Sequence, residues 1–209
     1  MANTNRPSGL QPVGNLEGGP WTGKANIYSI PASYATALYI GDPVTLSGTA
    51  TAVTGVPEIK ILTAGDAGAI TGQTAARVPI GVIVGLGKYE GLMANPSNLD
   101  ITYRPASDTS IWYALVCDDP YVLFEAQDVG SSTALTYTDV GANINLNAGT
   151  QTYNYISAWG LDNNSKGTTY SYQAKILRLV RRSNNDVGAY SRWICKWNVH
   201  QYAFYSLGL

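Results

Sequence analysis

The sequence predicts an all-β protein whose body is a β-sandwich or a jelly-roll-like fold of short antiparallel strands. After Lys24 the chain consists of short apolar runs interrupted by Gly, Pro, Asn and Asp, as in strands joined by turns. The 15 tyrosines and the many threonines also favour strands. No window holds the apolar spacing of a capped amphipathic helix, and the nearest approach lies around 64–76. We therefore expect about ten short strands and little helix.

Residues 1–24 differ from the rest of the chain. They contain three prolines and five glycines and few apolar side chains that are placed to reach a core. We expect them to form an extended N-terminal arm that does not fold by itself, so that its removal leaves a folded body over 25–209. A Pro- and Asn-rich break at 94–100 marks either a boundary between sub-lobes 25–95 and 96–209 or a long surface loop.

Five runs in the first part of the body are expected to be strands, at 26–31, 36–48, 77–87, 110–118 and 121–127. The turn Gly41-Asp42-Pro43 interrupts the second run, because Pro43 cannot donate a ladder hydrogen bond. The dipeptide Asp119-Pro120 separates the last two runs, which we expect to be a pair of core strands.

After a polar stretch at 130–149, three further runs follow at 154–159, 168–182 and 192–202. The last run alternates, which predicts one buried face and one face that is wet or lies in an interface. The buried face is expected to carry Trp193, Cys195, Trp197 and Val199, and the other face Ile194, Lys196, Asn198 and His200.

The charge balance argues against nucleic acid and membrane surfaces as partners. The chain has 13 basic and 14 acidic side chains and a net charge of −1. No apolar stretch approaches the ~20 residues of a membrane span, and no signal peptide is recognisable. We expect a soluble, reducing compartment, in which Cys117 and Cys195 are buried free thiols rather than a disulfide.

Charged residues make up only 13% of the chain, about half the usual share. Either much of the surface lies against other proteins, or this is an ordinary β-protein rich in Thr and Tyr.

The motifs give no support to an enzyme, a cofactor or a metal ion. The glycines of 85–91 are spaced G-x-G-x-x-x-G and no helix follows, so a turn is expected instead of a nucleotide site. The segment 162–167 begins like a calcium loop, but Lys166 occupies the fifth position and Ala174 the twelfth. His200 is the single histidine and no G-x-S-x-G motif accompanies it, so we expect a hydrogen-bonding residue at a surface or an interface.

Aromatic side chains crowd the last fifty residues, where either they bind sugar rings on an exposed sheet face or they are core and interface anchors. They are Trp159, Tyr170, Tyr172, Trp193, Trp197, Tyr202 and Tyr205.

Segments from both ends and the middle of the chain resemble the head decoration, or cement, proteins of tailed bacteriophages. They are ANTNRPSGLQPVG, YIGDPVTLSG, PIGVIVGL, YVLFEAQ and LRLVRRSNNDVGAYSRWICKWNVHQY. The resemblance implies a β-rich virion protein, made in the bacterial host cytoplasm, that binds the outside of the assembled capsid. It also implies a homotrimer at three-fold or quasi-three-fold positions, with arms that cross neighbouring subunits of the major capsid protein.

A Pro- and Gly-rich arm suits this role because it would become ordered on contact with the capsid, and three linked copies would add their weak contacts. Its candidate anchors are Arg6, Leu10, Val13, Leu16 and Trp21. Two alternatives remain. One is a tail or neck connector subunit, and the other is a carbohydrate-binding β-sandwich that uses Trp193, Trp197, Tyr202 and Tyr205.

Overall fold

The computed structural model describes residues 3–52, 54–68, 75–88, 101–130, 132–150 and 155–203. The prediction of an all-β fold is confirmed, since these residues form mainly antiparallel strands. Their helical segments are the three-residue 3-10 turns η2 (Ala75–Arg77), η4 (Tyr137–Asp139) and η5 (Asn163–Ser165). None of the helices formed by these residues is long and apolar enough to cross a membrane.

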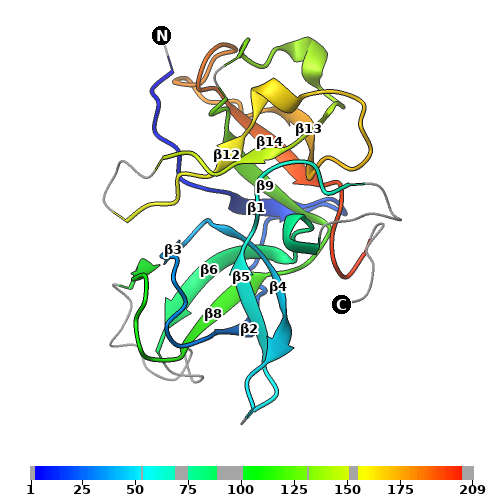
Figure 1. Cartoon of the computed structure of the whole chain (residues 1–209). Coiled ribbons are helices and arrows are strands. Elements are labelled where there is room, and N and C mark those ends of the chain that lie inside the picture. Colours follow the sequence, from blue (N-terminus) through cyan, green and yellow to red (C-terminus); the bar gives the residue numbers. More distant parts are fainter. Residues whose placement is uncertain are drawn as a thin grey trace.

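The strands form two units, of which the first is a closed five-stranded barrel, in the lower half of Figure 1. Its strands follow the order β2 (Asn26–Ile30), β5 (Pro57–Ile61), β4 (Pro43–Ala50), β6 (Gly81–Gly87) and β8 (Trp112–Cys117). The barrel closes where β2 and β5 pair in parallel, while the other neighbours are antiparallel. Ile30, Val44, Ile59, Ile83 and Val116 are fully buried inside it.

The second unit is an open, antiparallel five-stranded sheet in the upper half of Figure 1. Its strands follow the order β1 (Gln11–Asn15), β9 (Val122–Gln127), β14 (Arg192–Trp197), β13 (Ala174–Leu179) and β10 (Asn143–Ile144). Two small pairs flank the units, β11 (Leu146–Asn147) with β12 (Gly160–Leu161) and β3 (Leu38–Tyr39) with β7 (Tyr103–Arg104).

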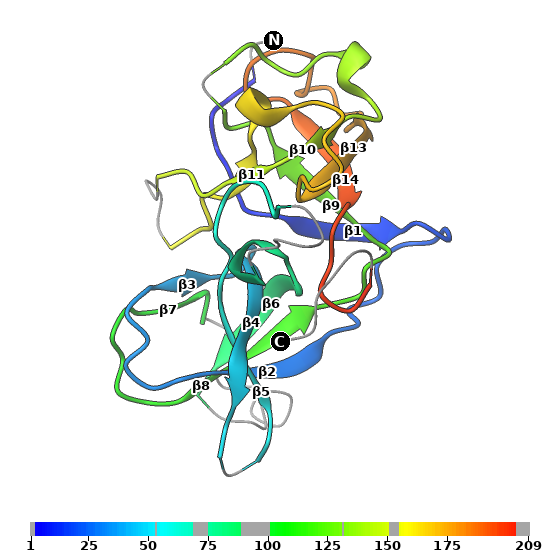
Figure 2. The same ribbon diagram turned by 45° about the vertical axis from the view of Figure 1, so that its right-hand side comes forward.

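The prediction of a separate N-terminal arm is wrong for residues 10–15. Strand β1 pairs with β9, with Gln11 opposite Glu125, and it lies at the boundary between the two units in both Figure 1 and Figure 2. Leu10 is only 1% exposed, and its N–H donates to the Gly41 carbonyl at 2.9 Å. Gly9 has a φ of 71°, and a Cβ there would collide with that carbonyl. The glycine therefore permits close packing on the barrel instead of preventing folding.

The prediction of sub-lobes 25–95 and 96–209 is also wrong, because β8 completes the barrel and ends at Cys117. The predicted strands 110–118 and 121–127, which contain β8 and β9, do not pair with each other, because β8 belongs to the barrel and β9 to the open sheet. The Asp119 side chain accepts from the Tyr121 N–H at 2.8 Å, and the turn at Asp119 redirects the chain from the barrel into the sheet. The candidate break at 94–100 lies outside the described residues.

The buried face predicted for the last run is confirmed, but the opposite face is not wet throughout, since Ile194 is only 5% exposed and His200 is fully buried. Trp193, Cys195 and Trp197 are fully buried, and the Trp197 ring packs on the Phe124 ring with 5.1 Å between centroids. The two cysteines are buried free thiols, as predicted. Burial raises the pKa of both thiols to about 12, so both remain protonated near neutral pH.

A shared core and buried polar contacts join the two units. Leu62, Val82 and Cys117 of the barrel side belong to the same apolar cluster as Phe124 and Trp197 of the sheet. Across the boundary, the fully buried Gln173 side chain donates to the carbonyls of Thr63 at 3.0 Å and Arg77 at 2.9 Å. The units therefore form one body.

Two titratable side chains are buried at this boundary. His200 was expected at a surface or an interface between chains, but it is fully buried, and its Nε2 lies 2.8 Å from the Ile80 carbonyl of the barrel side. Burial lowers the His200 pKa to about 4. Asp42, which is 2% exposed, accepts from the Tyr39 N–H at 2.8 Å and from the Ser157 hydroxyl. Burial raises the Asp42 pKa to about 7.

Leu10→Ala is expected to lower the free energy of unfolding by about 2–5 kcal/mol, because it leaves a cavity where β1 packs on the core. Leu16→Ala is the matched control, since Leu16 is 48% exposed and its loss should change stability by less than about 0.5 kcal/mol. Urea denaturation measures both. Equal effects of the two substitutions would contradict the placement of Leu10 in the core.

Asp42 and His200 are expected to give opposite dependences of stability on pH. Between about pH 4 and 6.5 the unfolded chain binds the extra proton at His200, so this group makes stability rise with pH. Between about pH 4 and 7 the folded chain binds the extra proton at Asp42, so this group makes stability fall with pH. Each slope is at most about 1.4 kcal/mol per pH unit.

Relative to the wild type, Asp42→Asn should therefore make the slope of unfolding free energy against pH more positive, and His200→Gln should make it more negative. Urea denaturation at several values between about pH 4.5 and 6.5 measures these slopes. Slopes parallel to that of the wild type in both variants would show that neither group titrates at the boundary.

Candidate functional site

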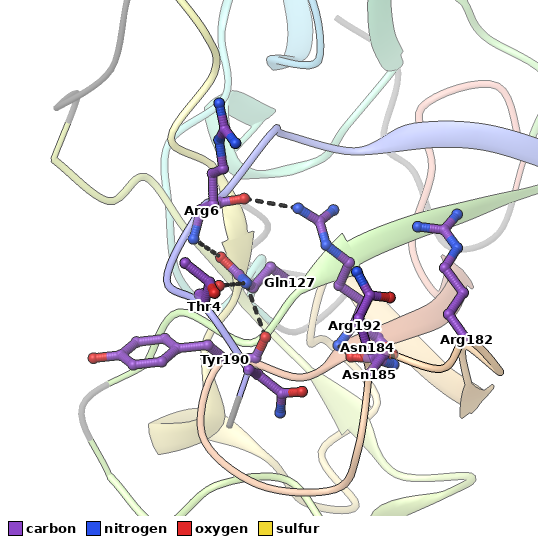
Figure 3. A pocket seen from close by; sticks show the side chains of 9 residues that line it. Thr4, Arg6, Gln127, Arg182, Asn184, Asn185, Tyr190 and Arg192 are labelled. Atoms are coloured by element: carbon purple, nitrogen blue, oxygen red, sulfur yellow. Dashed lines mark hydrogen bonds between the residues drawn. The ribbon is translucent and has the colours of Figure 1, made fainter. Parts of the chain in front are cut away.

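The N-terminal segment 3–13 borders two adjoining hollows, one of about 340 Å³ and one of about 620 Å³. Arg182, Asn184 and Arg192 line both of them. The smaller hollow is also lined by Asn3, Thr4, Arg6, Gln127, Asn185 and Tyr190, and it is shown in Figure 3. The larger one is also lined by Ser8, Gln11, Val13, Ile40, Thr102, Glu125, Tyr155 and Ile156. We call the two together the N-terminal groove.

A carboxylate and two guanidinium groups form the wall between the hollows. Glu125 of β9 is 4% exposed and holds Arg182 through two parallel contacts, 2.9 Å to Nη1 and 2.6 Å to Nη2. Arg192 at the start of β14 approaches the same carboxylate at 3.4 Å. Bidentate pairs of this kind fix the arginine geometry. The Arg182 side chain is still 54% exposed and can be reached from solvent.

The Gln127 side chain holds the N-terminal segment in place. Its Oε1 accepts from the Arg6 N–H at 2.9 Å, and its Nε2 donates to the carbonyls of Thr4 and Tyr190 at 2.8 Å each (Figure 3). Arg192 adds a bond of 2.7 Å to the Arg6 carbonyl. The Arg6 side chain points away from Gln127 in Figure 3. Among the described residues, its guanidinium has no hydrogen-bond or ion-pair partner.

A stack of three tyrosine rings stands beside the larger hollow. The Tyr103 ring lies 5.8 Å from the Tyr39 ring and 4.0 Å from the Tyr155 ring, with interplanar angles of 14° and 12°. Tyr155 lines the hollow, is 55% exposed and has a φ of 57°. Non-glycine residues with positive φ are uncommon and cluster at binding sites, which is a reason to look for a binding role at Tyr155.

The groove is locally basic in a chain that is nearly neutral. Arg6, Arg182 and Arg192 line it together with one carboxylate, that of Glu125. The sequence also shows an uneven distribution of charge, which the net charge of the whole chain does not reveal. Residues 1–128 contain six basic and eleven acidic side chains, whereas residues 129–209 contain seven and three. The run RLVRR at 178–182 is the local mark of this asymmetry.

The five candidate anchors of the N-terminal segment divide into two groups. Arg6, Val13 and Leu16 are exposed and are open to a partner. Leu10 belongs to the core, and Trp21 is partly buried against the same cluster. The Trp21 Nε1 donates to the Lys24 carbonyl at 3.3 Å. A partner therefore cannot reach Leu10 without opening the fold.

The three C-terminal tryptophans are core residues, whereas Tyr170 is 55% exposed and Tyr172 is partly buried. Trp159 is 5% exposed, and Trp193 and Trp197 are fully buried, so these rings cannot stack on a sugar or on a second subunit. Tyr202 is 57% exposed, and its hydroxyl lies 3.3 Å from the Tyr28 hydroxyl. Tyr205 lies outside the described residues.

The segment 162–167 forms a turn, as predicted. Asp162 caps η5 by accepting from the Asn164 N–H at 3.1 Å. Within the described parts of the chain, no group of three or more His, Cys, Asp or Glu side chains is arranged to hold a metal ion.

The chain matches no protein-family model, no curated protein and no solved structure. The resemblance to phage decoration proteins therefore stays a prediction from the sequence.

Gln127→Ala is expected to release the N-terminal segment from the sheet, because it removes the partners of three backbone groups. The free energy of unfolding should fall by about 1–3 kcal/mol, and the amide protons of 4–6 should exchange faster with solvent. Asn184→Ala is the matched control, since Asn184 lines the same groove and makes no side-chain hydrogen bond within the described residues. Hydrogen-exchange mass spectrometry separates the two, and unchanged exchange in Gln127→Ala would contradict this role.

Proposed function

We propose that this chain is a structural virion protein that binds the outer surface of a tailed-bacteriophage capsid and stabilises the lattice of the major capsid protein. The proposal starts from the sequence resemblance. The structural observation that carries it is a patch of exposed apolar side chains along β1 and the turn that follows it.

Val13, Leu16 and Tyr121 make up this patch, with exposed fractions of 39%, 48% and 43%. The Leu16 N–H donates to the Tyr121 carbonyl at 2.9 Å, which joins the turn after β1 to the start of β9. Strand β1 is an edge strand of the sheet, and Val13 lies at the irregularity in its pairing with β9. Exposed apolar groups at a sheet edge favour contact with another protein.

Because residues 10–15 are folded, they cannot bind the capsid by the ordering of a free arm, which is the mechanism that the Pro- and Gly-rich composition suggested. A free arm would lose conformational entropy when it becomes ordered on the capsid, whereas residues 10–15 are already held in the sheet. Their exposed side chains are thus presented in a fixed arrangement. Assembly as a homotrimer would repeat the patch three times and strengthen weak contacts through effective concentration.

The copy number of the chain in purified virions distinguishes this role from that of a tail or neck connector. A decoration protein follows the capsid lattice and is expected in many copies over the shell, on its outer surface. Quantitative mass spectrometry and cryo-electron microscopy of the particle measure number and place. Absence from the particle, or confinement to the tail attachment site, would contradict the proposal.

The double variant Val13→Asp/Leu16→Asp should weaken binding to capsids that lack the chain by about tenfold or more, because it places two carboxylates in an apolar contact. Val140→Asp is the matched control, since Val140 is 45% exposed and lies away from β1, before β10. Co-sedimentation with capsids measures binding, and circular dichroism confirms folding. Equal binding of the double variant and the wild type would show that the patch is not the contact.

A further inference from the structure

We infer that the N-terminal groove binds a carbohydrate that carries carboxylate groups, such as a uronic or sialic acid. The inference does not depend on the capsid role. It rests on the exposed ring of Tyr155, which two further tyrosine rings support, and on the arginine cluster, which line the same groove.

The charge of the groove selects an anion. Arg6, Arg182 and Arg192 line the groove, and Glu125 directly contacts the guanidinium groups of Arg182 and Arg192. Arg182 remains half exposed, and Arg6 has no side-chain partner within the described part of the chain. Guanidinium groups hydrogen-bond carboxylates through two parallel N–H donors, so a sugar carboxylate fits the side chains that line both hollows.

The tyrosine stack selects a ligand with a flat apolar face. Tyr155 is supported by Tyr103 at 4.0 Å, which in turn lies on Tyr39. The ring is therefore held in place before a ligand arrives, at little entropic cost. The C–H face of a pyranose ring packs well on such an aromatic surface, while its hydroxyl groups can bond to the amides of Gln11 and Asn184 in the same hollow.

The shape of the groove favours an oligosaccharide over an acidic peptide or a nucleic acid. Hollows of about 340 and 620 Å³ fall in the usual size range of small-ligand sites. Acidic side chains of a peptide would use the arginines but not the tyrosine face. The groove contains one locally basic cluster, whereas phosphate chains are bound by basic side chains spread along their path.

Isothermal titration with oligosaccharides of galacturonic acid and of sialic acid tests the inference on the full chain. At least one of the two is expected to bind saturably, while a neutral maltotetraose, polyglutamate and inorganic phosphate bind much more weakly. Arg6→Gln and Tyr155→Asn should each reduce the affinity about tenfold or more. Asparagine is chosen at 155 because it tolerates positive φ.

Two variants serve as matched controls, Arg181→Gln and Tyr137→Ala. Arg181 and Tyr137 are exposed residues of the same types that line neither hollow, and their replacement should leave the affinity unchanged. Melting temperatures close to that of the wild type confirm that each variant is folded. No binding of either acidic sugar overturns the inference. Equal binding of polyglutamate or phosphate, or full affinity in Tyr155→Asn, overturns it as well, since the tyrosine face would then play no part.

Discussion

The hydrophobic core beneath the open sheet is the constraint on which the rest of the structure depends, because the sheet cannot complete that core alone. Phe124 and Trp197 supply its centre, but Val82 and Cys117 of the barrel and Leu10 of the N-terminal segment share the same cluster. A side chain such as Val82, Leu10 or Phe124 contributes about 1.5–3 kcal/mol on full burial. Separating the two units, or removing the N-terminal segment, would expose apolar surface on both sides of the boundary. The barrel and the sheet are therefore expected to unfold together.

Local sequence predicted most of the longer strands but not their partners, and it missed β1 and β5 and predicted a strand at 154–159, where residues 155–159 form none. The alternation from Trp193 to Trp197 reflects one buried face, and a period of two residues reports that face directly. The dipeptide Asp119-Pro120 is compatible both with a hairpin and with a crossover between units. The choice is made by distant strands, since β8 pairs with β2 and β6, and β9 with β1 and β14. Sequence patterns describe only neighbouring residues, so they do not predict pairings between strands that are far apart in the chain.

The N-terminal segment and the groove also depend on contacts between distant residues, which a local sequence pattern does not predict. Three prolines and five glycines in 1–24 predict disorder when the segment is considered alone. Its order comes from Gln127 and Arg192, more than a hundred residues away, which bond the backbone on either side of Arg6. The sequence analysis named Arg6 as a candidate anchor for a partner, and the structure leaves its side chain exposed. It did not predict the groove, whose wall needs Glu125, Arg182 and Arg192 to come together from three separate segments.

The proposed capsid contact and the proposed sugar site share one element. Val13 belongs to the apolar patch and also lines the larger hollow, and Arg6 lines the smaller hollow on the same segment. Because Gln127 fixes the backbone between Thr4 and Arg6, a ligand in the groove would stabilise the arrangement that β1 presents to a partner. If a groove ligand raises the affinity for the partner by some factor, thermodynamic linkage requires that the partner raise the affinity for the groove ligand by the same factor. The size of that factor depends on how often the N-terminal segment detaches from the sheet when neither the ligand nor the partner is bound. The hydrogen bonds of Gln127 limit this detachment.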